Sequence, residues 1–247
     1  SIRNLEVDMP GEAVKGLDLD IRKGEIIGLG GLAGQGKIGV SNGILGLYPS
    51  DGSISYEGQQ LPMNNPLAVL KRKIAFVSED RRNVGLILSE SIEENISIGA
   101  LRVNGKFLKK YGPITQIDKK AVKDNSDRMI EDFKIKCVSG KQHVSDLSGG
   151  NQQKVCMARA LTMEPDLLFV SEPTRGIDVG TKVEIQKLVL KLAAEGKSVT
   201  FISSEIDEML RVCSRLIVMR DRQVVGELTG DELTQSNIMK TIAGGDQ

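Results

Sequence analysis

The sequence has 247 residues and balances 33 Lys and Arg against 33 Asp and Glu, so its formal net charge is zero. This length fits one domain, or one domain with a lobed insertion, and it is long enough to bury a core. The neutral balance argues against a dedicated nucleic-acid surface, and an aromatic content of 3% without any Trp leaves few platforms on which bases could stack.

The first third of the chain predicts short strands, a glycine-rich loop and a helix. Turns at Pro10–Gly11 and Lys23–Gly24 separate the first three strands, and the glycine-dense loop Gly28–Gly36 precedes the helix. The predicted elements are strands near Leu5–Val7, Val14–Ile21 and Glu25–Leu29, a helix over 37–47, a hairpin over 51–62 and a buried strand over Lys73–Ser78.

The middle of the chain predicts a mostly helical lobe over about 83–160, with a connection at Gly105–Pro113 and an amphipathic helix near 117–133. Buried strands then alternate with helices. The expected elements are strands Leu167–Val170 and Val199–Ser203, helices 181–195 and Glu205–Val212, a hairpin of Ile217–Arg220 with Val224–Leu228, and a frayed end at Gly244–Gln247. This alternation indicates an α/β fold with a mainly parallel sheet.

Several classes of protein are excluded by other features of the sequence. The three cysteines are widely separated, so we expect a reducing cytosol and neither a disulfide framework nor a zinc site. No apolar run approaches the ~20 residues that span a bilayer, and no signal-peptide pattern stands at the start. Because the first residue is Ser rather than Met, we interpret the sequence as a fragment or a processed chain.

The segment Gly31–Ile38 (Gly-Leu-Ala-Gly-Gln-Gly-Lys-Ile) fits the phosphate-loop pattern G-x-x-x-x-G-K. Glycines let several backbone N–H groups face one anion, while Lys37 and the helix N-terminus add positive charge. The alternative is a glycine-rich turn that binds nothing. The position that usually supplies a hydroxyl to Mg²⁺ is Ile38, which offers no oxygen. The predicted nucleotide contacts of this loop are Gly31, Gly34, Gln35, Gly36, Lys37 and Ile38.

A second nucleotide-site pattern follows the strand Leu167–Val170, where the chain continues as Ser171-Glu172-Pro173. In a Walker B strand the residue after the apolar run is an Asp that holds Mg²⁺, and here it is Ser171. Glu172 can orient or deprotonate an attacking water, which makes it the candidate catalytic residue. The alternative is a core strand that ends in a polar turn.

The segment Leu147–Lys154 (Leu-Ser-Gly-Gly-Asn-Gln-Gln-Lys) resembles the signature of ATP-binding-cassette ATPases, in the form found in sugar importers. Ser148 and the amides after it open a helix, and a helix N-terminus attracts anions. The resemblance implies that this end faces the γ-phosphate held by the opposite cassette. The predicted signature contacts are Leu147, Ser148, Gly149, Gly150, Asn151 and Gln152.

The resemblance covers nearly the whole chain and is closest to the second, C-terminal cassette of ribose/galactose-type importers. Glu172–Gly180 and Ser78–Arg82 look like the corresponding segments of those proteins. The resemblance implies one ABC ATPase domain over 1–247, with a P-loop core and an antiparallel β portion in 1–82 and 161–247, and a helical lobe over about 83–160.

The same resemblance implies ATP as the ligand and the cytoplasmic face of the bacterial plasma membrane as the location, in a peripheral position. The implied partners are an N-terminal cassette of the same polypeptide or a second cassette, transmembrane permease subunits and, indirectly, a solute-binding protein. No nucleic-acid partner is expected.

Four positions depart from the family pattern. Glu79 stands at the lid position, where most cassettes have Gln, and Ser204 replaces the switch histidine. Ile38 and Ser171 replace the two Mg²⁺ ligands, so we expect Mg²⁺ to bind weakly or not at all. No aromatic residue precedes Tyr48, so the usual adenine platform is also absent.

These departures predict an importer cassette whose own site binds nucleotide weakly and hydrolyses it poorly, while its signature loop completes the partner's site. The transported solute would be a monosaccharide or a similar polar molecule. Three alternatives remain: a fully active cassette, including one from a nucleoside or autoinducer importer; a non-transport cassette of the translation-factor or DNA-repair type; and a purely regulatory nucleotide-binding module.

Overall fold

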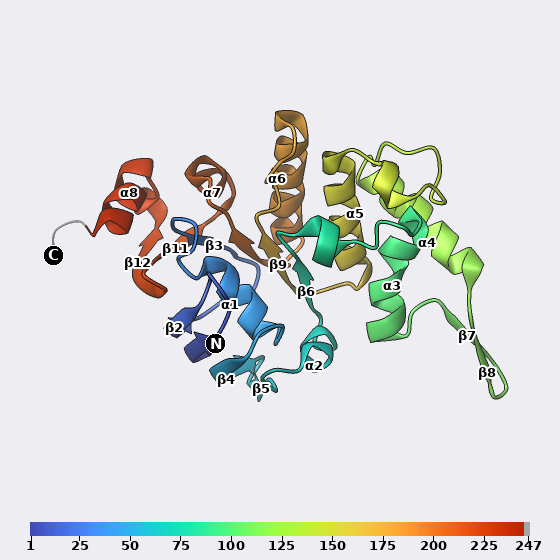
Figure 1. Ribbon diagram of the computed structural model, residues 1–247, viewed down its shortest axis with the longest axis horizontal. Coiled ribbons are helices and arrows are strands. Elements are labelled where there is room, and N and C mark those ends of the chain that lie inside the picture. Colours follow the sequence, from blue (N-terminus) through green and yellow to red (C-terminus); the bar gives the residue numbers. More distant parts are fainter. Residues whose placement is uncertain (245–247) are drawn as a thin grey trace. The chain divides into compact units, whose positions relative to one another are not determined.

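The computed structural model describes residues 1–244 (Figure 1). Its strands are β1 (Ile2–Val7), β2 (Val14–Leu19), β3 (Ile26–Gly30), β4 (Ser50–Tyr56), β5 (Gln59–Gln60), β6 (Ile74–Val77), β7 (Leu108–Tyr111), β8 (Ile114–Ile117), β9 (Leu167–Ser171), β10 (Ser198–Ile202), β11 (Arg215–Arg220) and β12 (Gln223–Thr229). Its α-helices are α1 (Lys37–Ile44), α2 (Pro66–Leu70), α3 (Ile92–Asn104), α4 (Lys119–Asp132), α5 (Gly149–Thr162), α6 (Val179–Ala194), α7 (Ile206–Val212) and α8 (Gln235–Ala243). Shorter helical turns occur at Arg81–Gly85, Val144–Asp146 and Gly230–Glu232.

The chain divides into two compact units, and the first comprises residues 1–76, 166–172 and 186–247. Its larger sheet has the order β12-β11-β3-β10-β9-β6. The strands β11, β3, β10 and β9 run parallel, and β12 pairs antiparallel with β11. A smaller antiparallel sheet has the order β2-β1-β4-β5. These sheets confirm the predicted α/β fold with a mainly parallel sheet.

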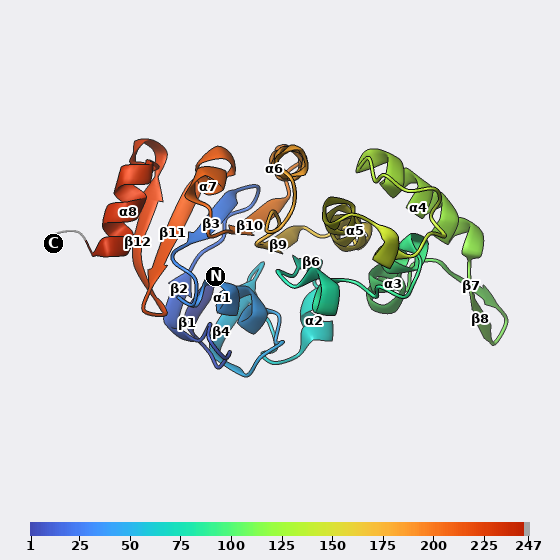
Figure 2. The same ribbon diagram turned by 45° about the horizontal axis from the view of Figure 1, so that its top comes forward.

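Strand burial in the first unit follows from what covers each sheet. Every residue of β3, β9 and β10 is buried, whereas β1 and β2 alternate between buried and exposed positions. Helix α1 contacts β1, β2 and β4 of the smaller sheet and β9 of the larger one. Figure 2 shows α7 and α8 on the side of the larger sheet that is opposite to α1. The loops that follow β3, β9 and β10 therefore gather at one edge of this sheet.

The second unit comprises residues 77–165 and 173–185 and is built on α3, α4 and α5. Helix α3 packs against both α4 and α5. It begins with a capping box, in which Ser91 and Glu94 each bond to the other's backbone N–H. The hairpin β7–β8 joins α3 to α4 and extends away from them (Figure 1).

That hairpin corrects the sequence-based expectation for this part of the chain. Residues Gly105–Pro113 were expected to form a plain connection, but β7 lies within them and β8 precedes α4. Every residue of both strands is exposed, so no burial pattern marks them in the sequence. The turn depends on Gly112, whose φ of 60° suits glycine, and on Pro113 after it.

Several helix bounds also differ from the expected ones. Helix α1 ends at Ile44 rather than at residue 47, because Gly46 adopts a left-handed φ of 70°. The short α2 and the C-terminal α8 were not predicted. Of the predicted frayed end, Gly244 caps α8, and residues 245–247 lie outside the described part. The extents of the core and of the helical lobe stay predictions.

Two observations bear on membrane and redox context. Among residues 1–244, no helix combines the length and the apolar character needed to cross a membrane. All three cysteines are free thiols, and burial raises the pKa of the Cys156 thiol to about 12. Cys156 therefore stays protonated and unreactive near neutral pH.

Candidate functional site

The phosphate loop connects β3 to α1 within the first unit. Gly31 and Gly36 have positive φ values of 146° and 93°. A Cβ atom would lie 2.3 Å from a carbonyl oxygen of β11 at Gly31 and 2.6 Å from the Ala13 carbonyl oxygen at Gly36, so neither position has room for a side chain. The Gln35 side chain accepts a hydrogen bond from the N–H of Asp221. The loop therefore forms the tight turn that its sequence predicts.

Three predicted site residues meet beside this loop. Lys37 is fully buried, and its ammonium nitrogen lies 3.3 Å from a carboxylate oxygen of Glu172. The Ser204 hydroxyl accepts a hydrogen bond from Lys37 and donates one to Glu172 over 2.6 Å. Glu172 follows β9 and Ser204 follows the neighbouring parallel strand β10, which brings both side chains to one edge of the sheet. The three residues form one hydrogen-bonded cluster.

The protein offers few oxygen ligands for Mg²⁺ at this cluster. Mg²⁺ requires oxygen ligands in octahedral geometry, and the Ile38 side chain has none. Ser171 is fully buried, and its hydroxyl has no hydrogen-bond partner within residues 1–244. The same residues contain no group of three or more His, Cys, Asp or Glu that could hold a metal. One neutral hydroxyl does not replace a hydroxyl and a carboxylate, so these residues do not fit a usual Mg²⁺ site.

Glu12, which the sequence did not single out, hydrogen-bonds the phosphate loop. The N–H of Gly34 donates to one oxygen of its carboxylate over 2.9 Å, and the N–H of Gly36 donates to the other over 2.8 Å. The N–H of Ile38 lies 3.4 Å from that second oxygen. Glu12 lies between β1 and β2, and no motif or spacing marks it. Only the tertiary structure brings this carboxylate to the loop.

The signature segment opens α5 in the second unit, as predicted. Ser148 is the N-cap, and its hydroxyl oxygen accepts hydrogen bonds from the backbone and side-chain amides of Asn151 over 3.4 and 3.0 Å. A Cβ atom at Gly150 would lie 2.8 Å from a side-chain oxygen of α6. Leu147 and Gln152 are buried, whereas Ser148 is exposed. The segment is thus anchored by its buried residues, and its N-cap Ser148 faces solvent.

Two other segments that resemble the family reach the same helix end. Arg81 donates a hydrogen bond to the carbonyl oxygen of Arg175 over 2.9 Å. A Cβ atom at Gly149 would lie 2.9 Å from the Arg81 guanidinium. Glu79 belongs to the same unit, where the Ser78 hydroxyl donates to its carboxylate over 3.4 Å. The lid role of Glu79 stays a prediction.

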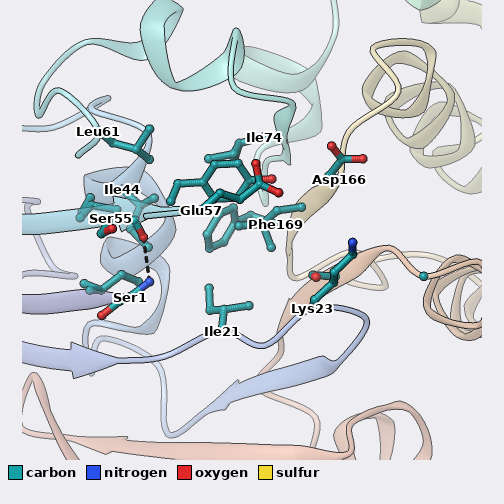
Figure 3. A pocket seen from close by; sticks show the side chains of 16 residues that line it. Ser1, Ile21, Lys23, Ile44, Ser55, Glu57, Leu61, Ile74, Asp166 and Phe169 are labelled. Atoms are coloured by element: carbon teal, nitrogen blue, oxygen red, sulfur yellow. Dashed lines mark hydrogen bonds between the residues drawn. The ribbon is translucent and has the colours of Figure 1, made fainter. Parts of the chain in front are cut away.

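The first unit also contains a cavity of about 380 Å³, which no predicted site residue lines (Figure 3). Apolar side chains such as Ile44 and Phe169 form much of its wall. Asp166, another lining residue, is paired with Lys73 and Lys197 at 3.5 Å each. The chain's own lysines therefore neutralise this carboxylate, and we assign no function to the cavity.

A comparison with models of protein families identifies the family to which these motifs belong. The model described as ABC transporter matches residues 14–175, more than half of the chain. The chain belongs to the ABC transporter family. The matched range includes the phosphate loop, the signature and Glu172, so the family predicted from these motifs is confirmed.

Curated relatives in the ABC transporter family are sugar-import ATP-binding proteins by name. A putative ribose/galactose/methyl galactoside import ATP-binding protein of Halalkalibacterium halodurans is 40% identical over 229 residues, which cover 92% of this chain and 42% of that protein. The ribose import ATP-binding protein of Caldanaerobacter subterraneus is 37% identical over 227 residues, covering 92% and 45%. The fructose import ATP-binding protein of Bifidobacterium longum is 37% identical over 243 residues, covering 96% and 46%. The chain thus spans less than half the length of these relatives.

Solved ABC cassettes share the fold at low sequence identity. A nucleotide-free ATP-binding cassette from an ABC transporter matches with a TM-score of 0.78 and 23% identity, covering 97% of this chain and 94% of that one. A dimeric cassette in a post-hydrolysis state bound to ADP and phosphate matches with a TM-score of 0.76 and 24% identity, covering 92% and 97%. These similarities confirm the fold class.

Proposed function

We propose that this chain is the nucleotide-binding domain of an ABC importer that takes up a monosaccharide or a similar polar solute. The names of the relatives support the solute class. Their length supports a second proposal. A relative about twice as long as the matched region has room for two fused cassettes, of which this chain corresponds to one. The resemblance of its motifs favours the second, C-terminal cassette.

In this proposal the chain's own site holds nucleotide weakly and hydrolyses it poorly. Lys37 and the loop amides can still bind phosphates, and Glu172 could still act on a water. However, Ile38 and Ser171 supply neither of the usual metal ligands, and a metal neutralises charge that develops during phosphoryl transfer. Loss of these ligands should therefore slow hydrolysis more than it weakens binding.

The signature loop, by contrast, is competent to complete a partner's ATP site. The single observation that carries the proposal is this contrast within one chain. The N-cap Ser148 is in place at the start of α5 and is exposed, whereas Ile38 and Ser171 leave the phosphate site without its usual metal ligands. A helix N-terminus capped this way offers N–H groups and a positive dipole end to a γ-phosphate.

The partners follow from this role. We place the cassette peripherally on the cytoplasmic face of the bacterial plasma membrane, against transmembrane permease subunits. A first cassette, on the same polypeptide or on another chain, would hold the hydrolysed ATP. A solute-binding protein would act only indirectly, through the permease.

Solute uptake and ATPase rates of the complete transporter test the proposal, at matched expression and confirmed assembly. Gly149→Asp should abolish both, because it places a negative charge against the partner's γ-phosphate. Lys37→Ala should reduce both only modestly, because little hydrolysis is expected at its site. If Lys37→Ala proves as damaging as Gly149→Asp, this pocket is a working site and the proposal is wrong.

A further inference from the structure

The phosphate loop already holds an anion that belongs to the chain itself. Its N–H groups at Gly34 and Gly36 each donate to a different oxygen of the Glu12 carboxylate, over 2.9 and 2.8 Å. The N–H of Ile38 points at the same group from 3.4 Å. A curled loop of this kind turns its amides toward one anion, which in a nucleotide site is a phosphate. Here a carboxylate occupies them.

The backbone around Glu12 is fixed against the loop by close packing. A Cβ atom at Gly39 would lie only 1.9 Å from the Glu12 carbonyl oxygen, and one at Gly36 would lie 2.6 Å from that of Ala13. The Glu12 N–H also closes a turn onto the Met9 carbonyl oxygen, over 3.0 Å. Glycines at the N-cap of α1 (Gly36) and within its first turn (Gly39) therefore let the Glu12–Ala13 segment lie directly on the start of α1, so the Glu12 side chain extends from a fixed backbone.

The Lys37 ammonium, the positively charged group of the site, is also paired with a carboxylate of the same chain. Lys37 is fully buried, and its ammonium nitrogen lies 3.3 Å from the Glu172 carboxylate. Both the amides and the ammonium that would bind a nucleotide's phosphates thus face carboxylates of the same chain. The two carboxylates must move away from the amides and the ammonium before a phosphate can make the same contacts, because like charges repel strongly at short range.

We infer that Glu12 sets the nucleotide affinity of this site, as an internal carboxylate that competes with phosphate for the loop amides. Nucleotide binds only when Glu12 has left the loop, so the apparent affinity falls by the fraction of molecules whose loop is free. If about one molecule in ten is free, affinity is about tenfold weaker than that of the open loop. This inference rests on the proposed nucleotide site. It attributes the weak nucleotide binding to the Glu12 carboxylate on the loop amides rather than to the missing metal ligands.

The test is calorimetric titration of the 247-residue chain with pyrophosphate and with ADP, without Mg²⁺. Without the metal, the result does not depend on Ile38 or Ser171. Glu12→Ala should raise the affinity for both ligands about tenfold or more. Glu12→Gln should give a smaller rise, because its neutral amide can still accept a loop hydrogen bond but no longer repels phosphate. Glu6→Ala removes the same charge from an exposed position of β1 and should leave affinity within about twofold.

Equal affinities of Glu12→Ala and Glu6→Ala would overturn the inference, whether both match the wild type or both rise together. Hydrogen exchange of the Gly34 and Gly36 amides is an independent measurement. These amides should be protected in the ligand-free wild type and should exchange at least about tenfold faster in Glu12→Ala, which has no acceptor for them. Unchanged exchange in a folded Glu12→Ala variant would also overturn it. The proposed function could survive either result, because the Gly149→Asp and Lys37→Ala comparison does not involve Glu12.

Discussion

The phosphate loop and the signature loop, the two anion sites that we propose, are both glycine-rich turns at a helix start, but their surroundings differ. At the phosphate site, the loop amides are hydrogen-bonded to one carboxylate of the chain, and the buried Lys37 is paired with another. At the signature loop, the start of α5 is capped by Ser148, which is exposed, and the Arg81 guanidinium lies beside Gly149. The surrounding fold therefore decides whether a glycine-rich turn at a helix start is bonded to a carboxylate of the same chain or is left free of one.

The largest expected effect comes from adding a negative charge at Ser148 while keeping a side chain that caps α5. Ser148→Asp keeps a side chain that can accept the N–H of Asn151, so the helix should remain capped. It also places a negative charge where we propose that the partner's γ-phosphate binds, and two like charges about 4 Å apart repel by about 4 kcal/mol at an effective dielectric of 20. ATPase activity of the two-cassette protein should fall about a hundredfold or more, whereas Ser148→Asn, the neutral match, should lose far less. Equal losses in both variants would mean that charge is not the reason.

The second effect concerns hydrolysis by the chain alone. Steady-state ATPase of the isolated chain at millimolar Mg-ATP should stay near background, because Ile38 and Ser171 offer no usual metal ligands. A turnover above about 1 s⁻¹, which is ordinary for an enzyme, that disappears in Glu172→Gln would show a working site. The difference between the two anion sites would then be one of degree only.

The third effect is a gain of metal dependence. In the wild type, Mg²⁺ should strengthen ATP binding less than about tenfold, or 1.4 kcal/mol. Ile38→Thr combined with Ser171→Asp restores one hydroxyl and one carboxylate, so the gain from Mg²⁺ should exceed about tenfold. The matched control is Ile38→Val with Ser171→Asn, which has nearly the same shapes but lacks the hydroxyl and the carboxylate charge. Calorimetry with and without Mg²⁺ measures both, and a wild-type gain above tenfold would contradict the expectation.

The smallest effect is on stability. Ser148→Ala removes the acceptor that caps α5, which should lower the free energy of unfolding by about 1 kcal/mol. Ser148→Asn should restore most of that loss. Urea unfolding followed by circular dichroism measures the difference, and equal stability of the Ala and Asn variants would show that the N–H of Asn151 finds another acceptor.

Local patterns in the sequence were enough to predict several elements and motifs. Strands β3, β9 and β10 are runs of buried residues between turns, and their apolar stretches predicted them closely. The phosphate loop, Glu172 and the signature each carry a spacing that fixes their place at a strand end or a helix start. The family followed from these motifs. They also marked Lys37, Glu172 and Ser204 separately as site residues, and the structure brings the three together because neighbouring parallel strands end at one edge of the sheet.

The groups that pack against these motifs could not be predicted from local patterns. The β7–β8 hairpin is exposed on both faces, so it has none of the burial periodicity that reveals a strand. Glu12 stands in a turn with no motif, and its carboxylate reaches the loop because Gly36 and Gly39 let a distant backbone segment come close. Ser171 could be recognised as a missing ligand, but its burial without a hydrogen-bond partner among residues 1–244 required the packed core. Local patterns specify a residue's own backbone and face, whereas contacts between distant segments depend on how the whole sheet is assembled.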